Sequence, residues 1–289
     1  MRNVNNIVGR FAPSPTGPLH FGSLVAALAS FLDTRANQGT WLLRIEDLDP
    51  PRESESAPAK IMKQLHSFGM DWDAPPMFQS TRLDAYSEAL ARLSEAGHTF
   101  LCTCTRKATR GVYPGTCRDK QHTDQASAIR VLTTATSIHF DDQILGPRAY
   151  NMEQEIGDFI IKRKDGLFAY QLAVVVDDHF QQVNRIVRGS DLLDSTPRQI
   201  FLNRCLNYPS PSFAHFPVVL GDDGQKLSKQ AHAAPVTSED SATVLATALK
   251  ALGQRPVDRN PIGKMLDQAI RQWALDQIPR QLTIPNRDL

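Results

Sequence analysis

The first hundred residues alternate strand and helix patterns, which limits the chain to folds built around a parallel sheet. Residues 7–12 and residues 40–45 form short apolar runs that predict two buried strands. Between them, residues 19–37 carry apolar side chains at helical spacing, and Gly39 follows as a stop signal. A strand, a crossover helix and a second strand make up the repeating unit of parallel sheets. We therefore predict an α/β fold.

The composition is that of a soluble globular protein. Apolar residues make up 41% and charged residues 22% of the 289 residues, which excludes a largely disordered chain. The net charge is only +1, so a nucleic-acid partner would have to be held by local basic patches. No apolar run approaches the ~18 residues that a membrane span needs. With four unevenly spaced cysteines and no secretory signal, we expect a cytoplasmic monomer without a membrane partner.

A turn rich in proline and glycine joins the first strand to the first helix. Residues 10–23 read RFAPSPTGPLHFGS, and the helix is expected to begin beside His20. A helix N-terminus presents unpaired N–H groups and a partial positive charge, which suit a phosphate. Gly17 and Gly22 allow close approach of the backbone to such a ligand, and His20 can donate to a phosphoryl oxygen. Taken alone, such a turn more often has only a structural role before a core helix.

A second polar motif follows about 200 residues later, where residues 226–230 read KLSKQ after a Gly-Asp-Asp-Gly turn. Two lysines in a loop are ordinarily a solvated surface when nothing else accompanies them. A lysine ammonium on its flexible stem can, however, follow negative charge as it moves onto a leaving group. The pairing of this loop with the first motif therefore carries more weight than either segment alone.

Together the two motifs resemble the HIGH and KMSKS signatures of class I aminoacyl-tRNA synthetases. Residues 10–22 resemble the run R-F-A-P-S-P-T-G-x-L-H-x-G of the glutamate-specific subgroup. In the second motif, Gln230 stands at the last position, where the KMSKS pattern has Ser. The resemblance covers roughly residues 7–231 and implies a Rossmann-like parallel sheet that binds ATP with Mg²⁺. The residues implied for ATP are Thr16, Gly17, His20, Gly22, Lys226 and Lys229, with His20 and Lys229 acting in catalysis.

The same resemblance implies a pocket for glutamate. Arg10 and Arg188 would hold the side-chain carboxylate, because a planar guanidinium gives two-point recognition. Glu46 and Tyr170 would meet the α-ammonium group. A free glutamate carries two carboxylates and one ammonium group, so two arginines and one acid form the complementary set. The implied pocket comprises Arg10, Ala12, Ser14, Glu46, Tyr170 and Arg188.

Three cysteines cluster in the middle of the chain, where Cys102, Cys104 and Cys117 fall within sixteen residues. Three thiolates at this spacing can hold a tetrahedral Zn²⁺, although unligated cytosolic cysteines are the alternative. His122 is a chemically ordinary fourth ligand, whereas the resemblance favours Tyr113, since related short synthetases show C-x-C…Y-x₃-C. Because the cluster is remote from both motifs, we expect one structural zinc ion in an inserted module.

Two departures from ordinary glutamyl-tRNA synthetases bear on the substrate. Fewer than sixty residues follow the KLSKQ motif, too few for the large helical region that reads the anticodon. Ordinary members also have Asn where this chain has Val174, so we expect a pocket that lacks one amide. The chain resembles the glutamyl-queuosine tRNA(Asp) synthetases, stand-alone paralogues of the catalytic half. That family implies activation of L-glutamate with ATP and transfer to the queuosine base in the anticodon of tRNA(Asp).

Three other functions stay open at the level of sequence. A truncated glutamyl-tRNA synthetase would charge the 3′ end of a tRNA, and a small-molecule nucleotidyltransferase also uses a strand, a turn and a histidine-bearing helix. A catalytically dead paralogue would carry damaged ATP motifs, whereas His20, Gly22 and Lys229 are all present. We expect two halves of the catalytic domain at residues 1–97 and 157–235, an inserted zinc-binding α+β module at 98–156, and a short helical C-terminal region at 236–289.

Overall fold

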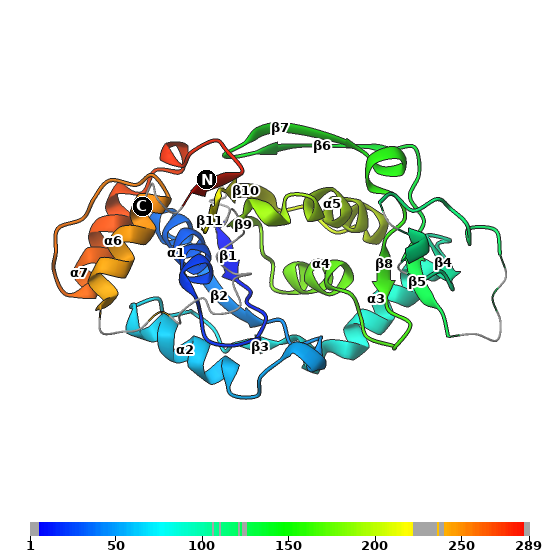
Figure 1. Ribbon diagram of the computed structural model, residues 1–289, viewed down its shortest axis with the longest axis horizontal. Coiled ribbons are helices and arrows are strands. Elements are labelled where there is room, and N and C mark those ends of the chain that lie inside the picture. The colour runs from blue at the N-terminus through cyan, green and yellow to red at the C-terminus, as the bar shows by residue number, and fades with distance from the viewer. Residues whose placement is uncertain are drawn as a thin grey trace.

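The computed structural model describes residues 6–105, 107–109, 111–120, 122, 126–221, 236 and 240–285. The predicted lysines Lys226 and Lys229 lie outside the described residues. The molecule is elongated, with a parallel α/β sheet near its centre. An antiparallel module lies at one end and the C-terminal helices at the other (Figure 1).

The strand–helix–strand unit predicted for the N-terminal part is confirmed. β1 (Val8–Phe11) and β2 (Thr40–Ile45) pair in parallel, and α1 (Phe21–Ala36) connects them. Gly39 is required where the chain turns back into β2, because a Cβ there would lie 2.4 Å from the carbonyl oxygen of Ile7. The local pattern of apolar side chains and turn residues therefore suffices to build this part of the sheet.

Strands from distant segments extend the sheet on both sides of this unit. β3 (Met77–Phe78) pairs in parallel with β2. On the other side, the backbone N–H of Asn184 donates to the carbonyl oxygen of Val8 at 3.1 Å, which sets β9 (Arg185–Gly189) beside β1. β10 (Ser212–Phe216) pairs in parallel with β9. The helices associated with these strands are α2 (Ala57–Ser67), α3 (Leu83–Glu95), α4 (Tyr170–Phe180) and α5 (Ser195–Leu206).

The inserted module is built from antiparallel strands. β4 (Thr99–Cys102) pairs with β5 (Ala128–Val131), and β5 pairs with β8 (Ile160–Lys162). β8 follows residue 156, so this small sheet crosses the predicted boundary of the module. Between β4 and β8 the described residues form no α-helix, only turns of 3₁₀- and π-helix, so the helical part of the α+β expectation is wrong there.

A long hairpin returns from this module to the parallel sheet. β6 (Ser137–Asp142) and β7 (Gly146–Asn151) pair along their whole length. In Figure 1 the hairpin spans the molecule from the module to the region of β10. At its tip the N–H of Gln143 donates to the carbonyl oxygen of Phe213 at 2.9 Å, and Ile144 is buried in the core beneath the sheet. The tip of this hairpin therefore ties the inserted module to the parallel sheet at β10.

The C-terminal part folds back onto the first helix. α6 (Ser241–Ala251) and α7 (Ile262–Gln272) are the two helices expected there, and both pack against α1. A strand that the sequence did not reveal, β12 (Thr283–Pro285), pairs in parallel with β11 (Val218–Leu220).

No helix in the described ranges combines the length and the apolar character that crossing a bilayer would require. Short helical turns lie at Pro50–Arg52, Gln79–Arg82, Lys107–Thr109, Met152–Ile156, Ser190–Leu192 and Leu275–Gln277.

Candidate active site

A cavity of about 510 Å³ opens at the carboxyl ends of β1, β2, β9 and β10. Ligands of open parallel sheets bind at this edge, because the loops that follow the strands converge there. Every predicted substrate or ATP residue in the described part of the chain lines this cavity: Arg10, Ala12, Ser14, Thr16, Gly17, His20, Gly22, Glu46, Tyr170 and Arg188. A second cavity, of about 640 Å³, is lined by none of these residues.

The proline-rich turn is held in place by the segment that follows β2. The N–H of Glu46 donates to the carbonyl oxygen of Pro13 at 3.0 Å, and the N–H of Ser54 donates to that of Pro15 at 2.9 Å. Rigid prolines supply few internal hydrogen bonds, so these outside donors fix the path of the turn. The contact also sets Glu46 beside the first motif, although 36 residues separate Arg10 from Glu46 in the sequence.

His20 is the N-cap of α1 and faces the cavity. Its Nδ1 accepts a hydrogen bond from the backbone N–H of Ser23 at 3.2 Å, so the ring proton of the neutral form belongs on Nε2. Burial lowers the pKa of His20 below the ordinary value, which keeps the ring neutral at pH 7. Nε2 lies 2.9 Å from Ser23 Oγ and can donate either to that oxygen or to a ligand. The helix N-terminus and this donor form one site for an anion.

On one side of the cavity, buried arginines and carboxylates form a cluster of ion pairs. Arg10 Nε lies 3.2 Å from Asp178 Oδ1, and Arg44 contacts both Asp178 at 2.8 Å and Glu46 at 3.5 Å. Burial disfavours the ionised form of Asp178, but the charges of Arg10 and Arg44 outweigh it and lower the pKa of that carboxyl. For Glu46, burial prevails over both arginines and raises the pKa to about 7.

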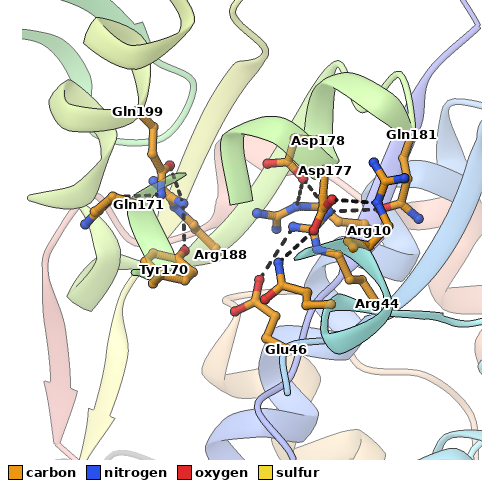
Figure 2. A network of polar contacts seen from close by, with 12 residues as sticks. Arg10, Arg44, Glu46, Tyr170, Gln171, Asp177, Asp178, Gln181, Arg188 and Gln199 are labelled. Carbon is orange, nitrogen blue, oxygen red and sulfur yellow. Dashed lines mark hydrogen bonds and ion pairs between the residues drawn. The ribbon is translucent and has the colours of Figure 1, made fainter. Parts of the chain in front are cut away.

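Arg188 on the other side of the cavity is held by neutral groups only. Its Nε donates to His215 Nε2 at 3.0 Å, its NH1 to Gln199 at 2.9 Å, and its NH2 to Thr196 at 2.7 Å. Among the described residues no carboxylate lies within ion-pair distance of this guanidinium. Figure 2 shows Arg188 with Tyr170, Gln171 and Gln199, separate from the group of Arg10, Arg44, Glu46, Asp178 and Gln181.

The positive charge of Arg188 is therefore available to a ligand. Burial and the neighbouring Arg10 lower the pKa of Arg188, yet a guanidinium stays protonated in proteins. The Arg10 cluster contains the carboxylates of Asp178 and Glu46, whereas Arg188 makes no ion pair with a described carboxylate, so an anionic group in the cavity gains most on the Arg188 side. The contact of Arg188 NH1 with the Tyr170 hydroxyl is the longest of its set, 3.5 Å, and both residues line the cavity.

Three supporting residues escaped the sequence analysis. Arg44 stands two positions before Glu46 on β2, and this spacing puts both side chains on one face of the strand. Asp178 stands eight positions after Tyr170 on α4, close to the same face of the helix. His215 has no such signal, because its partners come from β9, α5 and the β6–β7 hairpin. Val174, which stands where ordinary glutamyl-tRNA synthetases have Asn, is fully buried in the apolar core and does not line the cavity.

The three cysteines of the inserted module converge as the spacing predicted. The sulfurs of Cys102, Cys104 and Cys117 all lie within 4.8 Å of one another, so this group could hold a metal ion. The Tyr113 hydroxyl lies 3.5 Å from Cys102 Sγ and 3.6 Å from Cys104 Sγ. His122 also hydrogen-bonds Cys117, but it does not belong to the group whose ligand atoms all lie so close together.

The comparisons with known proteins agree with this geometry. The family model of the catalytic domain of class I tRNA synthetases for E and Q matches residues 6–112 and 105–249. A protein of Pseudomonas fluorescens named glutamyl-Q tRNA(Asp) synthetase is 46% identical over 99% of this chain and 98% of its own length. A protein of the same name from Pseudomonas syringae pv. syringae is 48% identical over 94% of this chain and 95% of its own length. The chain belongs to the glutamyl-Q tRNA(Asp) synthetase family.

Solved structures support the fold of this family member. A glutamate-tRNA synthetase of Elizabethkingia anophelis superposes with a TM-score of 0.80 at 23% identity, over 98% of this chain. A glutamate tRNA ligase of Elizabethkingia meningosepticum, solved with its amino acid, superposes with a TM-score of 0.79 at 24% identity, over 96% of this chain. The chain spans 69% and 66% of the lengths of these two proteins. The Rossmann-like class I core predicted from the sequence is thereby confirmed.

Proposed function

We propose that the protein activates L-glutamate with ATP and transfers it to the queuosine base of tRNA(Asp). The observation that carries this proposal is the cavity that joins two arginines and one acid to the N-terminus of α1. One wall supplies charge complementary to an amino acid with an extra carboxylate, and the other supplies donors for phosphate. A small-molecule nucleotidyltransferase would not need the two arginines and the acid of the first wall.

The charge balance of the cavity suggests how glutamate is seated. The side-chain carboxylate is drawn to Arg188, which makes no ion pair with a described carboxylate, with Arg10 on its other side. The ionised form of Glu46 attracts the α-ammonium group. The charges of Arg188 and Glu46 both act on the nearby Tyr170 hydroxyl. Glutamine lacks the negative charge that Arg188 favours, so the pocket selects the acid over the amide.

The activation step brings glutamate on one wall of the cavity together with ATP on the other. The α-carboxylate of glutamate attacks the α-phosphorus of ATP, a new C–O–P bond forms, and the bond to the leaving pyrophosphate breaks. Negative charge rises on the phosphoryl oxygens, where the N–H groups of α1 and the Nε2–H of His20 stabilise it. Mg²⁺ bound with ATP supplies further charge neutralisation, and Lys229 is proposed to reach the pyrophosphate.

The acceptor is proposed from the relatives. Those named glutamyl-Q tRNA(Asp) synthetase match this chain over nearly their whole lengths. Their shared name points to a hydroxyl of queuosine as the group that attacks the mixed anhydride and releases AMP. A truncated glutamyl-tRNA synthetase that charges the tRNA 3′ end is the competing function.

Mapping the product tests the proposed acceptor. The protein is incubated with ATP, labelled glutamate and tRNA(Asp) that contains or lacks queuosine, and the labelled tRNA is cut with nuclease. We expect label in the anticodon fragment of queuosine-containing tRNA only. Label at the 3′ end, or equal labelling of both tRNAs, would contradict this acceptor.

We propose that Cys102, Cys104, Cys117 and Tyr113 hold a structural Zn²⁺. With zinc–sulfur bonds of about 2.3 Å, the sulfurs of a tetrahedral site lie about 3.8 Å apart. The sulfurs of Cys104 and Cys117 are 3.6 Å apart. The Tyr113 oxygen lies near two sulfurs and accepts from the N–H of Cys117 at 3.0 Å, as a fixed fourth ligand would. The ion would join β4 to the loop that follows it.

Metal analysis checks this site. We expect about one zinc per chain, lost in the Cys102→Ser/Cys104→Ser variant because serine does not replace a thiolate ligand. Tyr113→Phe and His122→Ala separate the two candidate fourth ligands, since only the true ligand should weaken zinc retention against a chelator. Cys205→Ser in α5 is the matched control and should keep its zinc. A wild-type protein without metal would contradict the proposal.

The raised pKa of Glu46 predicts a pH dependence of glutamate use. Burial raises the pKa to about 7, and only the ionised carboxylate attracts the α-ammonium group. As the pH falls from 8 to 6, the KM for glutamate should rise, by up to about tenfold per pH unit below the pKa. The KM for ATP serves as the internal control. The Glu46→Gln variant should show a high KM for glutamate that hardly changes with pH, and a wild-type profile in that variant would refute the assignment.

A further inference from the structure

His215 links the Arg188 side of the cavity to the inserted module. It is fully buried, its Nδ1 lies 2.5 Å from Asp142 Oδ2, and its Nε2 lies 3.0 Å from Arg188 Nε. An arginine Nε–H can only donate, so Nε2 must accept and the ring proton belongs on Nδ1. Asp142 accepts that proton in a hydrogen bond. The three side chains therefore form a chain of hydrogen bonds with a defined direction.

Asp142 is itself fixed by the tip of the β6–β7 hairpin. Its Oδ1 accepts from the N–H groups of Leu145 at 2.9 Å and Ile144 at 3.1 Å, and from that of His215 at 3.2 Å. With Oδ2 on His215 Nδ1, both oxygens are used and the carboxylate cannot turn. The hairpin of the inserted module thus determines which nitrogen of His215 carries the proton.

We infer that His215 is a positioning residue, which orients Arg188 for a ligand carboxylate and is itself held by Asp142 of the inserted module. The inference rests on the proposed function and deepens it. Thr196 and Gln199 hold the two terminal nitrogens of Arg188. His215 holds Nε and so fixes the plane of the guanidinium. None of these three residues lines the cavity, whereas Arg188 does.

A neutral histidine in this place preserves the charge that recognises the substrate. Arg10 is paired with the carboxylate of Asp178, which it shares with Arg44, so its charge is partly balanced. A carboxylate in the place of His215 would likewise neutralise Arg188 and weaken the preference for an anionic ligand. Burial lowers the pKa of His215, despite the opposing effect of Asp142, and Arg188 adds to the lowering. The ring therefore stays an acceptor across the neutral pH range.

Two substitutions of His215 separate positioning from packing. In His215→Gln the amide oxygen can reach the place of Nε2 and accept from Arg188, at the loss of the donor to Asp142. In His215→Asn the amide NH₂ can keep the bond to Asp142, but no acceptor reaches Arg188. Both variants replace the buried ring by an amide, so the loss of the imidazole itself is common to the two.

Glutamate-dependent ATP–pyrophosphate exchange is the first measurement. Loss of a hydrogen bond to a charged group predicts a rise of the KM for glutamate by about tenfold or more in His215→Asn. His215→Gln should remain within about threefold of the wild type on the same reasoning, and the KM for ATP should hardly change in either. Equal KM values for glutamate in the two variants would overturn the inference.

A ¹⁵N spectrum of the imidazole rings gives a second readout that does not depend on activity. The His215 ring of the wild type should be neutral with its proton on Nδ1, and Asp142→Asn should weaken that preference. A ring protonated on Nε2, or on both nitrogens, would overturn the inference for an active enzyme and an inactive one alike. A wild type that shows the expected ring but no exchange with glutamate would instead contradict the proposed function.

Discussion

Replacing Arg188 by alanine should raise the KM for glutamate by about two to three orders of magnitude. Truncating one partner of a buried, hydrogen-bonded charge pair costs about 2–5 kcal/mol, and each 1.4 kcal/mol is about tenfold in affinity. The KM for ATP should stay within about threefold, because the charged head of Arg188 lies on the glutamate side of the cavity. The measurement is glutamate-dependent ATP–pyrophosphate exchange over a range of both substrates.

Two further variants make the Arg188 result interpretable. Arg188→Lys keeps a positive charge but lacks the planar fork, so we expect an intermediate KM for glutamate and a fold that survives. Arg204→Ala makes the same truncation at an exposed position of α5 and should behave as the wild type. Equal rises in the KM for glutamate and for ATP in Arg188→Ala would show that the residue does not select glutamate.

Replacing His20 should lower the rate of exchange by about 10²–10³-fold, the usual loss when one donor to a developing oxyanion is removed. His20→Ala removes the Nε2–H and also the N-cap of α1, which alone costs about 1 kcal/mol of stability. His20→Asn is the sharper variant, since asparagine is a good N-cap and keeps the helix start while the Nε2 donor is lost. The substitution should mainly lower kcat and change KM little, because the donor acts on charge that develops during the reaction.

The control for the His20 variants is a histidine outside the cavity. His66→Ala removes an exposed ring that pairs with Asp71, and it should leave the exchange rate unchanged. The melting temperatures of His20→Asn and the wild type should agree. Near-normal exchange in a folded His20→Asn variant would remove His20 from the proposed mechanism.

Much of the fold follows from local patterns in the sequence. The proline-rich turn, the helical spacing from Leu19 onward and the stop at Gly39 depend on neighbours in the chain, and the structure has the predicted strands and helix there. The spacing of the cysteines likewise allowed a metal site to be predicted, because a few linking residues bring the sulfurs together. The strand β12 was missed, since its pairing with β11 joins segments more than sixty residues apart.

The charged residues of the site were predicted through a resemblance between motifs, and they do converge on one cavity. Val174, which stands where ordinary glutamyl-tRNA synthetases have Asn, shows the limit of that approach. A position counted along the chain does not say which face of a helix it occupies, and in α4 this side chain turns to the core. Whether Lys229 reaches the same cavity stays a prediction, because it lies outside the described residues.

The sequence by itself determined which charges the protein brings: two arginines and an acid in motifs that can be recognised from neighbouring residues. Only the tertiary structure decided how far each charge is balanced by its neighbours and is therefore available to a ligand. Arg10 is paired with Asp178, whereas Arg188 is held by neutral partners that include His215. The effect of a buried charge depends on the few groups within about 4–6 Å of it, and here those groups come from distant elements of the chain.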